Sequence, residues 1–127
     1  MTNTAKNFDT DQWVLGNLGE SNTATWYEEM GYKILQLGYR TRRGEIDVIA
    51  QAEDGTVVFI EVKTRRGRNF GAAEAVTARK LGRMRSAAME WLADKPYTPV
   101  RFDVVEVLFD GHEFFFRLYQ GVEDGAC

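Results

Sequence analysis

The strand that most constrains the fold is the run VVFIEVK at residues 57–63, which is apolar on both faces along most of its length. Side chains on a strand alternate between the two faces of a sheet, so a strand of this composition needs cover on each side. Two segments with helical periodicity, at about residues 18–30 and 73–93, can supply that cover. The sequence therefore predicts an α/β fold in which a sheet lies between two helices.

The other segments predict the element order αβββαββ. Further strands are expected at residues 32–37, 45–51, 56–63, 101–109 and 113–119, and the turn sequence AEDG at 52–55 predicts a hairpin between the second and third of them. An Arg- and Gly-rich loop at 64–71 follows the central strand. A length of 127 residues suits a single core. We expect one domain over residues 1–127, with flexible ends at 1–12 and 120–127.

Cysteine content and hydropathy indicate a cytoplasmic location. Cys127 is the single cysteine, which excludes a disulfide framework and a thiolate metal cluster. No apolar run approaches membrane-spanning length, and residues 1–10 lack the hydrophobic centre of a signal peptide. We therefore expect a cytoplasmic protein with no membrane partner.

The net charge of −3 conceals an uneven distribution of charge along the chain. Residues 32–102 hold fourteen Lys or Arg against eight Asp or Glu, which makes the middle of the chain net +6. The basic residues form three clusters: Arg40, Arg42 and Arg43; Arg65, Arg66 and Arg68; and Arg79, Lys80, Arg83 and Arg85. Any one cluster alone is typical of a solvated surface. Together, next to paired carboxylates, they indicate a polyanionic ligand.

The predicted hairpin places charged residues at the ends of two apolar strands. Asp47 and Glu61 can lie close together if the strands pair across the turn, and Lys63 shares a face with Glu61. Two carboxylates about 4 Å apart repel by about 4 kcal/mol at an effective dielectric constant of about 20. A proton, a cationic side chain or a metal ion can offset that repulsion. Lys63 gives part of the compensation, and oxygen ligands without His or Cys favour Mg²⁺ or Mn²⁺ for the rest.

An exposed, weakly interacting Glu–Lys pair is the alternative interpretation of this pattern. Three features favour a functional site instead. Glu61 and Lys63 end an apolar strand, an acidic strand precedes it, and basic clusters flank both strands. Asp47 followed by Glu61-Val62-Lys63 resembles the D…(D/E)-x-K signature of the PD-(D/E)XK nuclease superfamily.

More closely, the chain is similar to the YraN-like family of small bacterial endonuclease-fold proteins. The matching stretches are GNLGE (16–20), GYKIL (31–35), RTRRGEIDVIA (40–50), VFIEVKTR (58–65), FGAAEAVTARK (70–80) and RFDVVEV (101–107). Two departures are Ile46, where the superfamily name has proline, and Gly38, where a polar residue is expected. The tail after Tyr119 matches less well.

The resemblance implies a restriction endonuclease-like αβββαβ(β) core with a central mixed sheet flanked by helices. Asp47 and Glu61 would hold Mg²⁺ or Mn²⁺ together with the backbone carbonyl of Val62, and Glu20 would join them directly or through water. Lys63 would orient the attacking water and offset charge in the transition state. The implied activity is metal-dependent hydrolysis of phosphodiester bonds in DNA, branched or damaged DNA included.

Several basic residues are candidate phosphate contacts, which position DNA without reading its sequence: Arg40, Arg43, Arg65 and Arg68. Lys80 lies on the apolar stripe of the second helix, where it either extends its ammonium to solvent or aims it at the active-site phosphate. Glu45 either supports the site or pairs with Arg42 or Arg43, and we favour the ion pair.

The competing functional class is a non-catalytic nucleic-acid-binding or assembly module that retains the fold. The acid–acid–lysine set favours the enzyme, because such a module gains nothing from negative charge where phosphate must approach. Whether the substrate is DNA or RNA, and whether the chain forms a homodimer, stay open at the level of sequence.

Overall fold

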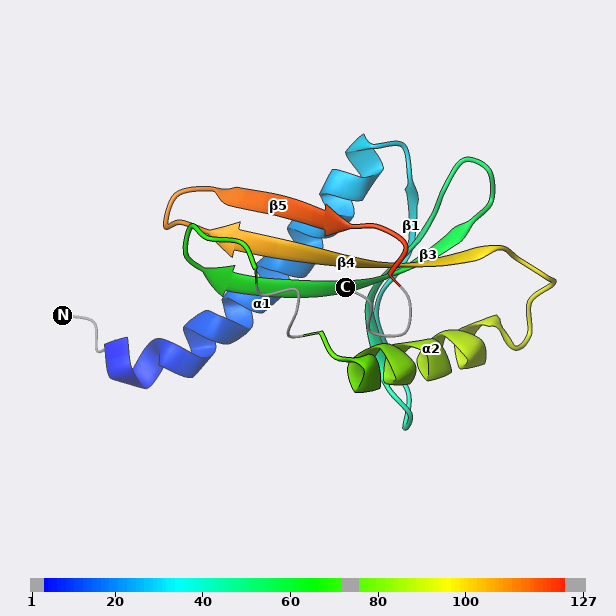
Figure 1. Cartoon of the computed structure of the whole chain (residues 1–127). Helices are drawn as coiled ribbons and strands as arrows, with labels where there is room; N and C mark the ends of the chain where they lie inside the picture. Colours follow the sequence, from blue (N-terminus) through cyan, green and yellow to red (C-terminus); the bar gives the residue numbers. More distant parts are fainter. Residues whose placement is uncertain (1–3, 72–75, 123–127) are drawn as a thin grey trace.

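The elements follow the predicted order αβββαββ. The computed structural model describes residues 4–71 and 76–122, which form α1 (Thr4–Glu29), β1 (Lys33–Arg40), β2 (Glu45–Gln51), β3 (Val57–Arg66), α2 (Ala78–Leu92), β4 (Val100–Phe109) and β5 (Phe114–Tyr119). The five strands form one sheet in chain order, in which β3 and β4 run parallel and the other neighbours run antiparallel (Figure 1). The predicted mixed α/β architecture, with two helices and a mixed sheet, is confirmed.

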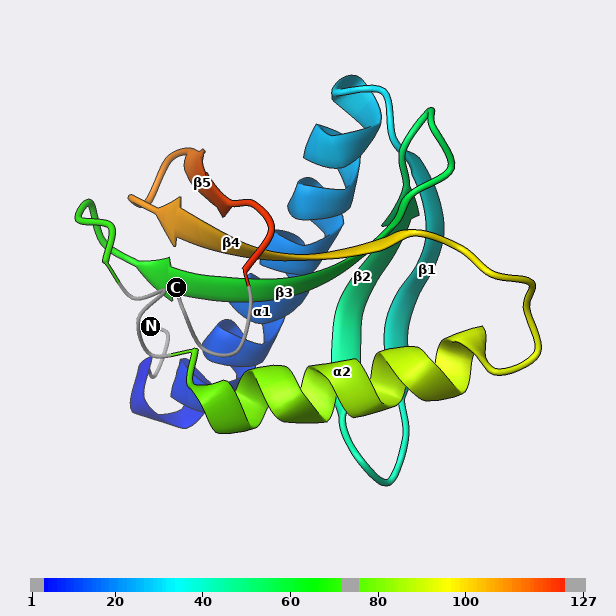
Figure 2. The ribbon, with the colours of Figure 1, turned by 45° about the vertical axis from the view of Figure 1, so that its right-hand side comes forward.

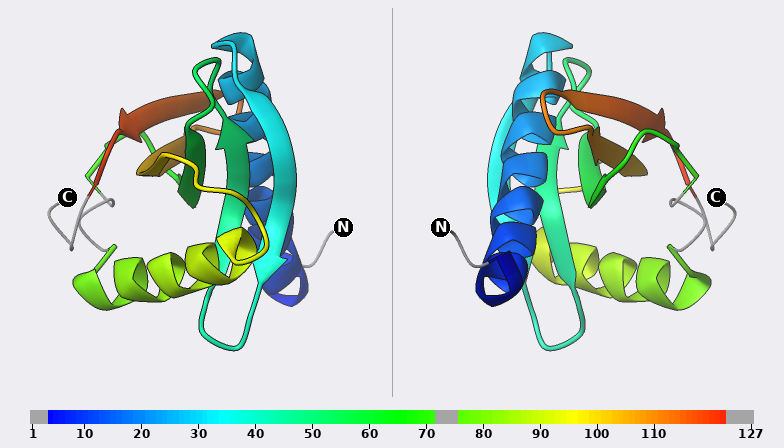
Figure 3. Two further views of the ribbon diagram at one scale, coloured as in Figure 1. Left: turned by 90° about the vertical axis from the view of Figure 1, so that its right-hand side faces the viewer. Right: turned by 90° about the vertical axis from the view of Figure 1, so that its left-hand side faces the viewer.

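The central strand β3 is covered on both faces, as its composition predicted. Residues 57–62 are all buried. Phe59 belongs to a cluster that includes Met84 of α2, whereas Ile60 belongs to a second cluster that includes Tyr27 of α1. The two helices therefore lie on opposite faces of the sheet (Figure 3). The core consists of two layers, one on each side of β3.

Helix α1 is longer than its sequence pattern indicated. It begins at Thr4, so residues 4–12, which were expected to form a flexible end, continue the helix. Residues 1–3 lie outside the described part of the chain. Residues 4–12 are largely polar in sequence and show no apolar stripe, but adding residues to an existing helix costs far less free energy than nucleating a new one. Within residues 4–71 and 76–122, neither helix combines the length and hydropathy needed to cross a membrane.

The chain after β5 returns to the sheet, contrary to the expected flexible end from residue 120. The Gly121 amide donates to Asp103 Oδ1 at 3.0 Å, and the Val122 amide donates to the Phe102 carbonyl at 2.8 Å. Val122 is buried in the cluster beneath α2. One hydrogen bond to a side chain, one to the backbone and one buried side chain fix residues 120–122. Residues 123–127 lie outside the described chain.

Helix α2 begins at Ala78, later than the predicted residue 73, because Thr77 caps it. Thr77 has extended backbone angles, and its side-chain oxygen accepts a hydrogen bond from the Lys80 amide at 3.2 Å. Residues 73–75 of the predicted helix lie outside the described chain. The β1–β2 turn, residues 41–44, projects past α2 (Figure 2). A Cβ on Gly44 would stand 2.3 Å from the Arg83 carbonyl oxygen, so glycine allows that turn to lie against the α2 backbone.

Strands β1 and β3 extend beyond their predicted ends because their neighbours continue to pair with them. Pairing of Arg40 with Glu45 carries β1 to residue 40, and pairing of Arg66 with Phe109 carries β3 to residue 66. Residues 64–66 are therefore strand rather than the predicted loop.

Two glycines of α1 provide a matched test of how closely this helix packs on β3. A Cβ on Gly19 would stand 1.9 Å from Thr64 Oγ1, whereas a Cβ on Gly16 would meet nothing within 4 Å. We expect Gly19→Ala to destabilise the fold by about 1–3 kcal/mol through overpacking. We expect Gly16→Ala to stabilise it by about 0.5–1 kcal/mol, since alanine favours the helix. Thermal unfolding of the two variants checks both signs, and equal shifts would contradict the close packing.

Candidate active site

The candidate site lies where β2 and β3 part. Their pairing runs from Gln51 opposite Val57 to Val48 opposite Ile60. Beyond this pair, the Val62 amide donates to Asp47 Oδ2 at 2.8 Å, so a side-chain oxygen replaces the backbone acceptor of the partner strand. The Asp47 carboxyl group also shares a hydrogen bond with Glu61. The prediction that the hairpin brings Asp47 beside Glu61 is confirmed.

Helix α1 adds a third carboxyl group, that of Glu20, which hydrogen-bonds to Asp47. Burial raises the pKa of Glu20, and the charge of Glu61 raises it further. Burial likewise raises the pKa of Asp47, to about 8, with Glu61 as the next cause, while the hydrogen bond from the Val62 amide opposes the shift. Burial, and after it the charge of Glu61, thus favour the protonated forms of Asp47 and Glu20.

Lys80 of α2 supplies a cation at this site. Its Nζ atom lies 3.0 Å from Glu61 Oε2, and the Glu61 side chain is only 8% exposed. Burial alone would lower the pKa of Lys80, but the hydrogen bond and charge of Glu61 outweigh it and the pKa is raised. Of the two alternatives for Lys80, extension to solvent and approach to a phosphate, the structure shows a third arrangement, an ion pair with a carboxylate of the site.

Lys63 lies on the same face of β3 as Glu61, as strand alternation predicted. It is half-buried and stands beside Glu106 in the β3–β4 register. Among the described carboxylates, none forms an ion pair with the Lys63 ammonium. That ammonium can therefore serve an incoming anionic group.

Comparison with known proteins gives a clear family assignment. The model of the family described as "Uncharacterised protein family UPF0102" matches residues 19–107, a span that contains Glu20, Asp47, Glu61 and Lys63. The chain belongs to the UPF0102 family. It is 50% identical over 119 residues to a UPF0102 protein of Corynebacterium efficiens, an alignment that covers 92% of this chain and 98% of the relative.

Two other relatives are similarly close. A UPF0102 protein of Corynebacterium diphtheriae is 46% identical over 93% of this chain and 98% of its own. A UPF0102 protein of Rhodococcus jostii is 48% identical over 78% of this chain and 85% of its own. The predicted YraN-like family membership is thereby confirmed at the level of UPF0102.

The carboxyl groups of Glu20, Asp47 and Glu61 in this UPF0102 protein offer the oxygen ligands that hard cations prefer. Some of these oxygens, however, already contact groups of the protein. Among the described residues, no three His, Cys, Asp or Glu side chains already stand in a metal-holding arrangement. Glu61 Oε2 contacts Lys80, and Asp47 Oδ2 accepts from the Val62 amide. Carboxylate oxygens are the ligands that Mg²⁺ and Mn²⁺ prefer. The donor chemistry fits such an ion, whose binding would require the carboxylates to draw together and the Lys80 ammonium to leave Glu61.

The basic residues of the UPF0102 chain differ in their freedom to contact phosphate. Arg40 pairs with Glu45 at 3.6 Å and Arg43 pairs with Glu90 at 3.8 Å, and both guanidinium groups stay largely exposed. Arg68 is also exposed. The guanidinium groups of Arg40, Arg43 and Arg68 therefore lie at the surface.

Arg65 and Glu45 depart from their predicted surroundings. Arg65 Nη2 donates to the Asn69 carbonyl and lies 3.5 Å from the fully buried Glu106 carboxylate, so part of this guanidinium already has partners within the protein. The ion-pair interpretation of Glu45 holds, but its partner is Arg40 rather than Arg42 or Arg43. The antiparallel register places Arg40 directly opposite Glu45.

Sequence reasoning missed two buried carboxylates on β4. Glu106 accepts from the Gly71 amide at 2.9 and 3.0 Å and from the Tyr119 hydroxyl at 3.3 Å, which ties the loop after β3 to the sheet next to Lys63. Asp103 accepts from the Tyr27 hydroxyl at 2.8 Å and pairs with Arg101 at 2.9 Å. The available signal was an acid within an apolar strand, the same signal that identified Glu61.

The raised pKa values predict how stability varies with pH when no divalent ion is present. A folded-state pKa above the ordinary value means that the folded protein holds a proton that the unfolded chain has released. Stability should therefore fall as pH rises from about 4 to about 8, the window between the ordinary pKa of Asp47 and its raised value.

Asp47→Asn removes this ionisation and keeps an acceptor for the Val62 amide. We expect the variant to unfold about 3–5 °C above the wild type at pH 8, with a smaller difference at pH 5. Thermal unfolding in EDTA measures both temperatures, with Glu45→Gln as the exposed-acid control. A wild type whose stability rises over this window would contradict the raised pKa.

Proposed function

We propose that this UPF0102 protein is a metal-dependent endonuclease of the PD-(D/E)XK type that binds DNA and hydrolyses its phosphodiester bonds. The observation that carries the proposal is the convergence of Glu20, Asp47 and Glu61 at the parting of β2 and β3. Lys63, on the same face as Glu61, completes the acid–acid–lysine set. A five-stranded mixed sheet between two helices is compatible with a restriction endonuclease-like core.

Each residue of the set has a distinct task in this proposal. Asp47 and Glu61 would hold Mg²⁺ or Mn²⁺ with the Val62 carbonyl, and Glu20 would complete the site directly or through water. When bound, the ion would polarise the scissile phosphate and activate the attacking water. The Lys63 ammonium would orient that water and neutralise charge that develops on the phosphate.

The exposed basic residues would hold the DNA backbone. Arg40, Arg43 and Arg68 can each offer a guanidinium to phosphate oxygens, an interaction that fixes position but carries no sequence information. Arg65 would contribute less than predicted, because it also holds Glu106. Cleavage of both strands of a duplex would require two sites, which a homodimer would provide.

The Lys80–Glu61 ion pair favours one alternative function. It neutralises Glu61 without a metal ion, so the same fold could act as a non-catalytic nucleic-acid-binding or assembly module. The gathering of Asp47 and Glu20 beside Glu61 argues against that reading, because burying three carboxyl groups together is costly and a binding module has no use for them.

A panel of labelled DNA and RNA substrates decides between the two functions. Linear duplex, single-stranded, flapped and branched molecules would be incubated with the wild type and Lys63→Ala, in Mg²⁺, Mn²⁺ or EDTA. The endonuclease proposal expects cleavage by the wild type that requires the divalent ion and is lost in Lys63→Ala. Binding by both proteins without any cleavage above the variant would establish the binding module instead.

A further inference from the structure

The sheet face that carries Glu61 and Lys63 continues beyond α2 to the edge strand β5. Lys80, which contacts Glu61, lies in the first turn of α2, so the helix covers this face only from Glu61 toward the start of β3. In the sheet register, Lys63 stands beside Glu106 of β4, and Glu106 stands beside Arg117 of β5. Residues paired directly across neighbouring strands have their side chains on one face. Arg117 therefore shares the face of Lys63.

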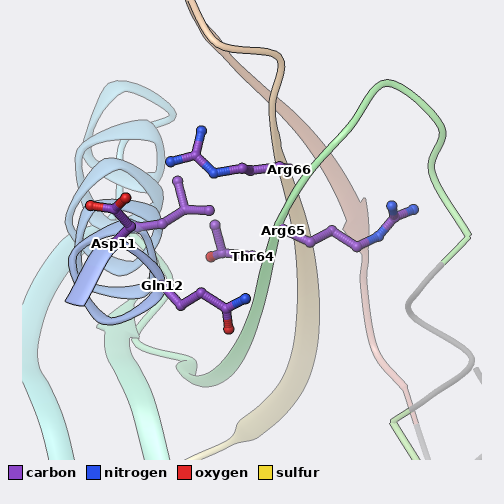
Figure 4. Close-up of a pocket in the computed structure, with 6 residues that line it drawn as sticks. Asp11, Gln12, Thr64, Arg65 and Arg66 are labelled. Carbon is purple, nitrogen blue, oxygen red and sulfur yellow. The ribbon is translucent and has the colours of Figure 1, made fainter. Parts of the chain in front are cut away.

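The same face continues one step further along β3, to Arg65. Figure 4 shows the alternation at this end of the strand, with Arg66 extended toward α1 and Arg65 pointing away from it. Arg65 stands beside Leu108, which stands opposite Phe115 of β5. Phe115 therefore lies on the face of Lys63, whereas the cavity of about 430 Å³ between α1 and Arg66 lies on the other face.

A pocket of about 370 Å³ opens on this face at the β4–β5 end of the sheet. Its lining comprises Arg68, Phe70, Leu108, Asp110 and Phe115. Phe115 is 42% exposed, so a large part of its surface is open to a ligand. Asp110 is committed to the β4–β5 turn, where its Oδ1 atom accepts from two backbone amides at 2.9 Å. The pocket thus presents two aromatic rings and one guanidinium group.

Arg117 adds a second guanidinium group next to this pocket. Its Cζ atom lies 5.8 Å from the centre of the Phe70 ring and 5.6 Å from the centre of the Tyr119 ring. Arg68 and Arg117 are both exposed, and neither has an ion-pair partner among the described carboxylates. Two cationic groups and two aromatic rings therefore border one surface, which we call the β5 platform: Arg68, Phe70, Phe115 and Arg117.

The chemistry of the β5 platform fits a single strand of nucleic acid better than a duplex or a bare anion. Aromatic side chains stack on bases, and arginines contact the phosphates between them. In a duplex each base face is covered by its neighbours in the stack, so only an unpaired nucleotide can present a base face to Phe115. A bare anion would contact the guanidinium groups and gain nothing from the rings.

The β5 platform lies a few nucleotides away from the candidate active site. The register places Phe115 two strands across and two residues along from Lys63. With strands about 4.8 Å apart and a rise of about 3.3 Å per residue, the two Cα atoms are about 12 Å apart. At about 3.4 Å per stacked nucleotide, and more in an extended strand, about two to four nucleotides cover this distance.

We propose that the β5 platform binds a single-stranded segment of the substrate as it leaves the candidate active site. The bases of this segment stack on the two phenylalanine rings, and its phosphates contact the two guanidinium groups. The inference rests on the proposed endonuclease function, because it takes the carboxylates of Asp47 and Glu61 as the point of cleavage. The substrate class would accordingly be DNA with an unpaired strand near the cleaved bond, such as a flap.

The test measures binding without catalysis, by fluorescence anisotropy in EDTA. The probes are a labelled oligothymidylate of about twelve nucleotides and a blunt hairpin duplex of similar length. We expect the wild type to bind the single strand at least about tenfold more tightly than the duplex. Phe115→Ala should weaken single-strand binding by about tenfold, and Phe115→Trp, which keeps a stacking ring, should not. Arg117→Gln should weaken it and lower the slope of log affinity against log salt by about 0.7, the effect of one lost phosphate contact.

Two variants elsewhere on the surface are the matched controls. Tyr97→Ala removes an aromatic residue that is 94% exposed, in the connection between α2 and β4. Arg66→Gln removes an exposed guanidinium group from the opposite face of β3. We expect both to bind the single strand within about a factor of two of the wild type. Thermal unfolding would confirm that every variant folds.

Three results would overturn the assignment: equal affinity for single strand and duplex, binding by Phe115→Ala like the wild type, or an equal loss in the controls. The proposed endonuclease fails separately, since a protein that binds the single strand through the β5 platform but cleaves nothing in Mg²⁺ keeps the platform and loses the activity. Conversely, wild-type rates of flap cleavage in Phe115→Ala and Arg117→Gln would leave the endonuclease intact and remove the β5 platform from its substrate recognition.

Discussion

Replacing Asp47 by Asn is expected to lower phosphodiester cleavage by at least about a thousandfold while DNA binding persists. The amide keeps an acceptor for the Val62 amide, so the parting of β2 and β3 is preserved. It loses the negative charge that a divalent ion needs, and the electrostatic contribution of that ion is worth several kcal/mol in the transition state. Single-turnover cleavage of the best substrate in the panel measures the loss.

Glu45→Gln is the matched control for this variant. Glu45 lies two residues away on the same strand, is exposed and pairs with Arg40 instead of joining the carboxyl cluster. We expect its cleavage rate to stay within about a factor of three of the wild type. Equal loss in the two variants would mean that β2 contributes a general negative potential rather than a ligand, and activity unaffected in both would remove Asp47 from the chemistry.

Replacing Lys80 by Met is expected to destabilise the metal-free protein and to strengthen its response to Mg²⁺. The change leaves Glu61, whose side chain is 8% exposed, next to Asp47 without its cation. Loss of a fully buried partner costs about 3–5 kcal/mol, and the half-exposed Lys80 ammonium should cost less, about 2 kcal/mol. The melting temperature should then fall by about 6–10 °C in EDTA.

Mg²⁺ should restore most of this loss, because the ion takes the position of the ammonium and stabilises the folded state by mass action. The wild type should gain less from the same Mg²⁺ concentration, since its ammonium must first be displaced. Arg79→Met is the control, as Arg79 is the exposed neighbour on the same helix. If the Lys80 and Arg79 variants respond alike in EDTA and in Mg²⁺, Lys80 is not the counter-ion of the site.

The parts of the site that follow from short-range pattern could be predicted from the sequence. A turn sequence between two apolar strands determined the hairpin register, and strand alternation then fixed which side chains lie next to Asp47. Lys63 was placed on the face of Glu61 by the same period of two. These inferences need no knowledge of how distant elements pack.

The parts that depend on distant packing could not be predicted. Lys80 reaches Glu61 only because α2 lies over β3, an arrangement fixed partly by the contact of Gly44 with the Arg83 carbonyl. The burial of Glu106 likewise depends on partners from the loop after β3 and from β5. The local sequence pattern identifies the acidic residue, but the partners of that residue depend on how the strands and helices pack.

The ends of the domain show the same limit. Residues 4–12 are largely polar in sequence, so no apolar stripe marked them as helical, although α1 includes them. The segment after β5 contains little apolar surface, yet two amide hydrogen bonds and Val122 hold it to the sheet.

The most direct test of the proposed site is a crystal structure grown with MnCl₂ and an uncleaved DNA strand, analysed by anomalous scattering. We predict an anomalous peak at about 2.0–2.4 Å from carboxylate oxygens of both Asp47 and Glu61, with the Lys80 ammonium displaced from Glu61. A structure in which Lys80 still contacts Glu61, with DNA bound and no peak between the two carboxylates, would contradict the metal-dependent mechanism.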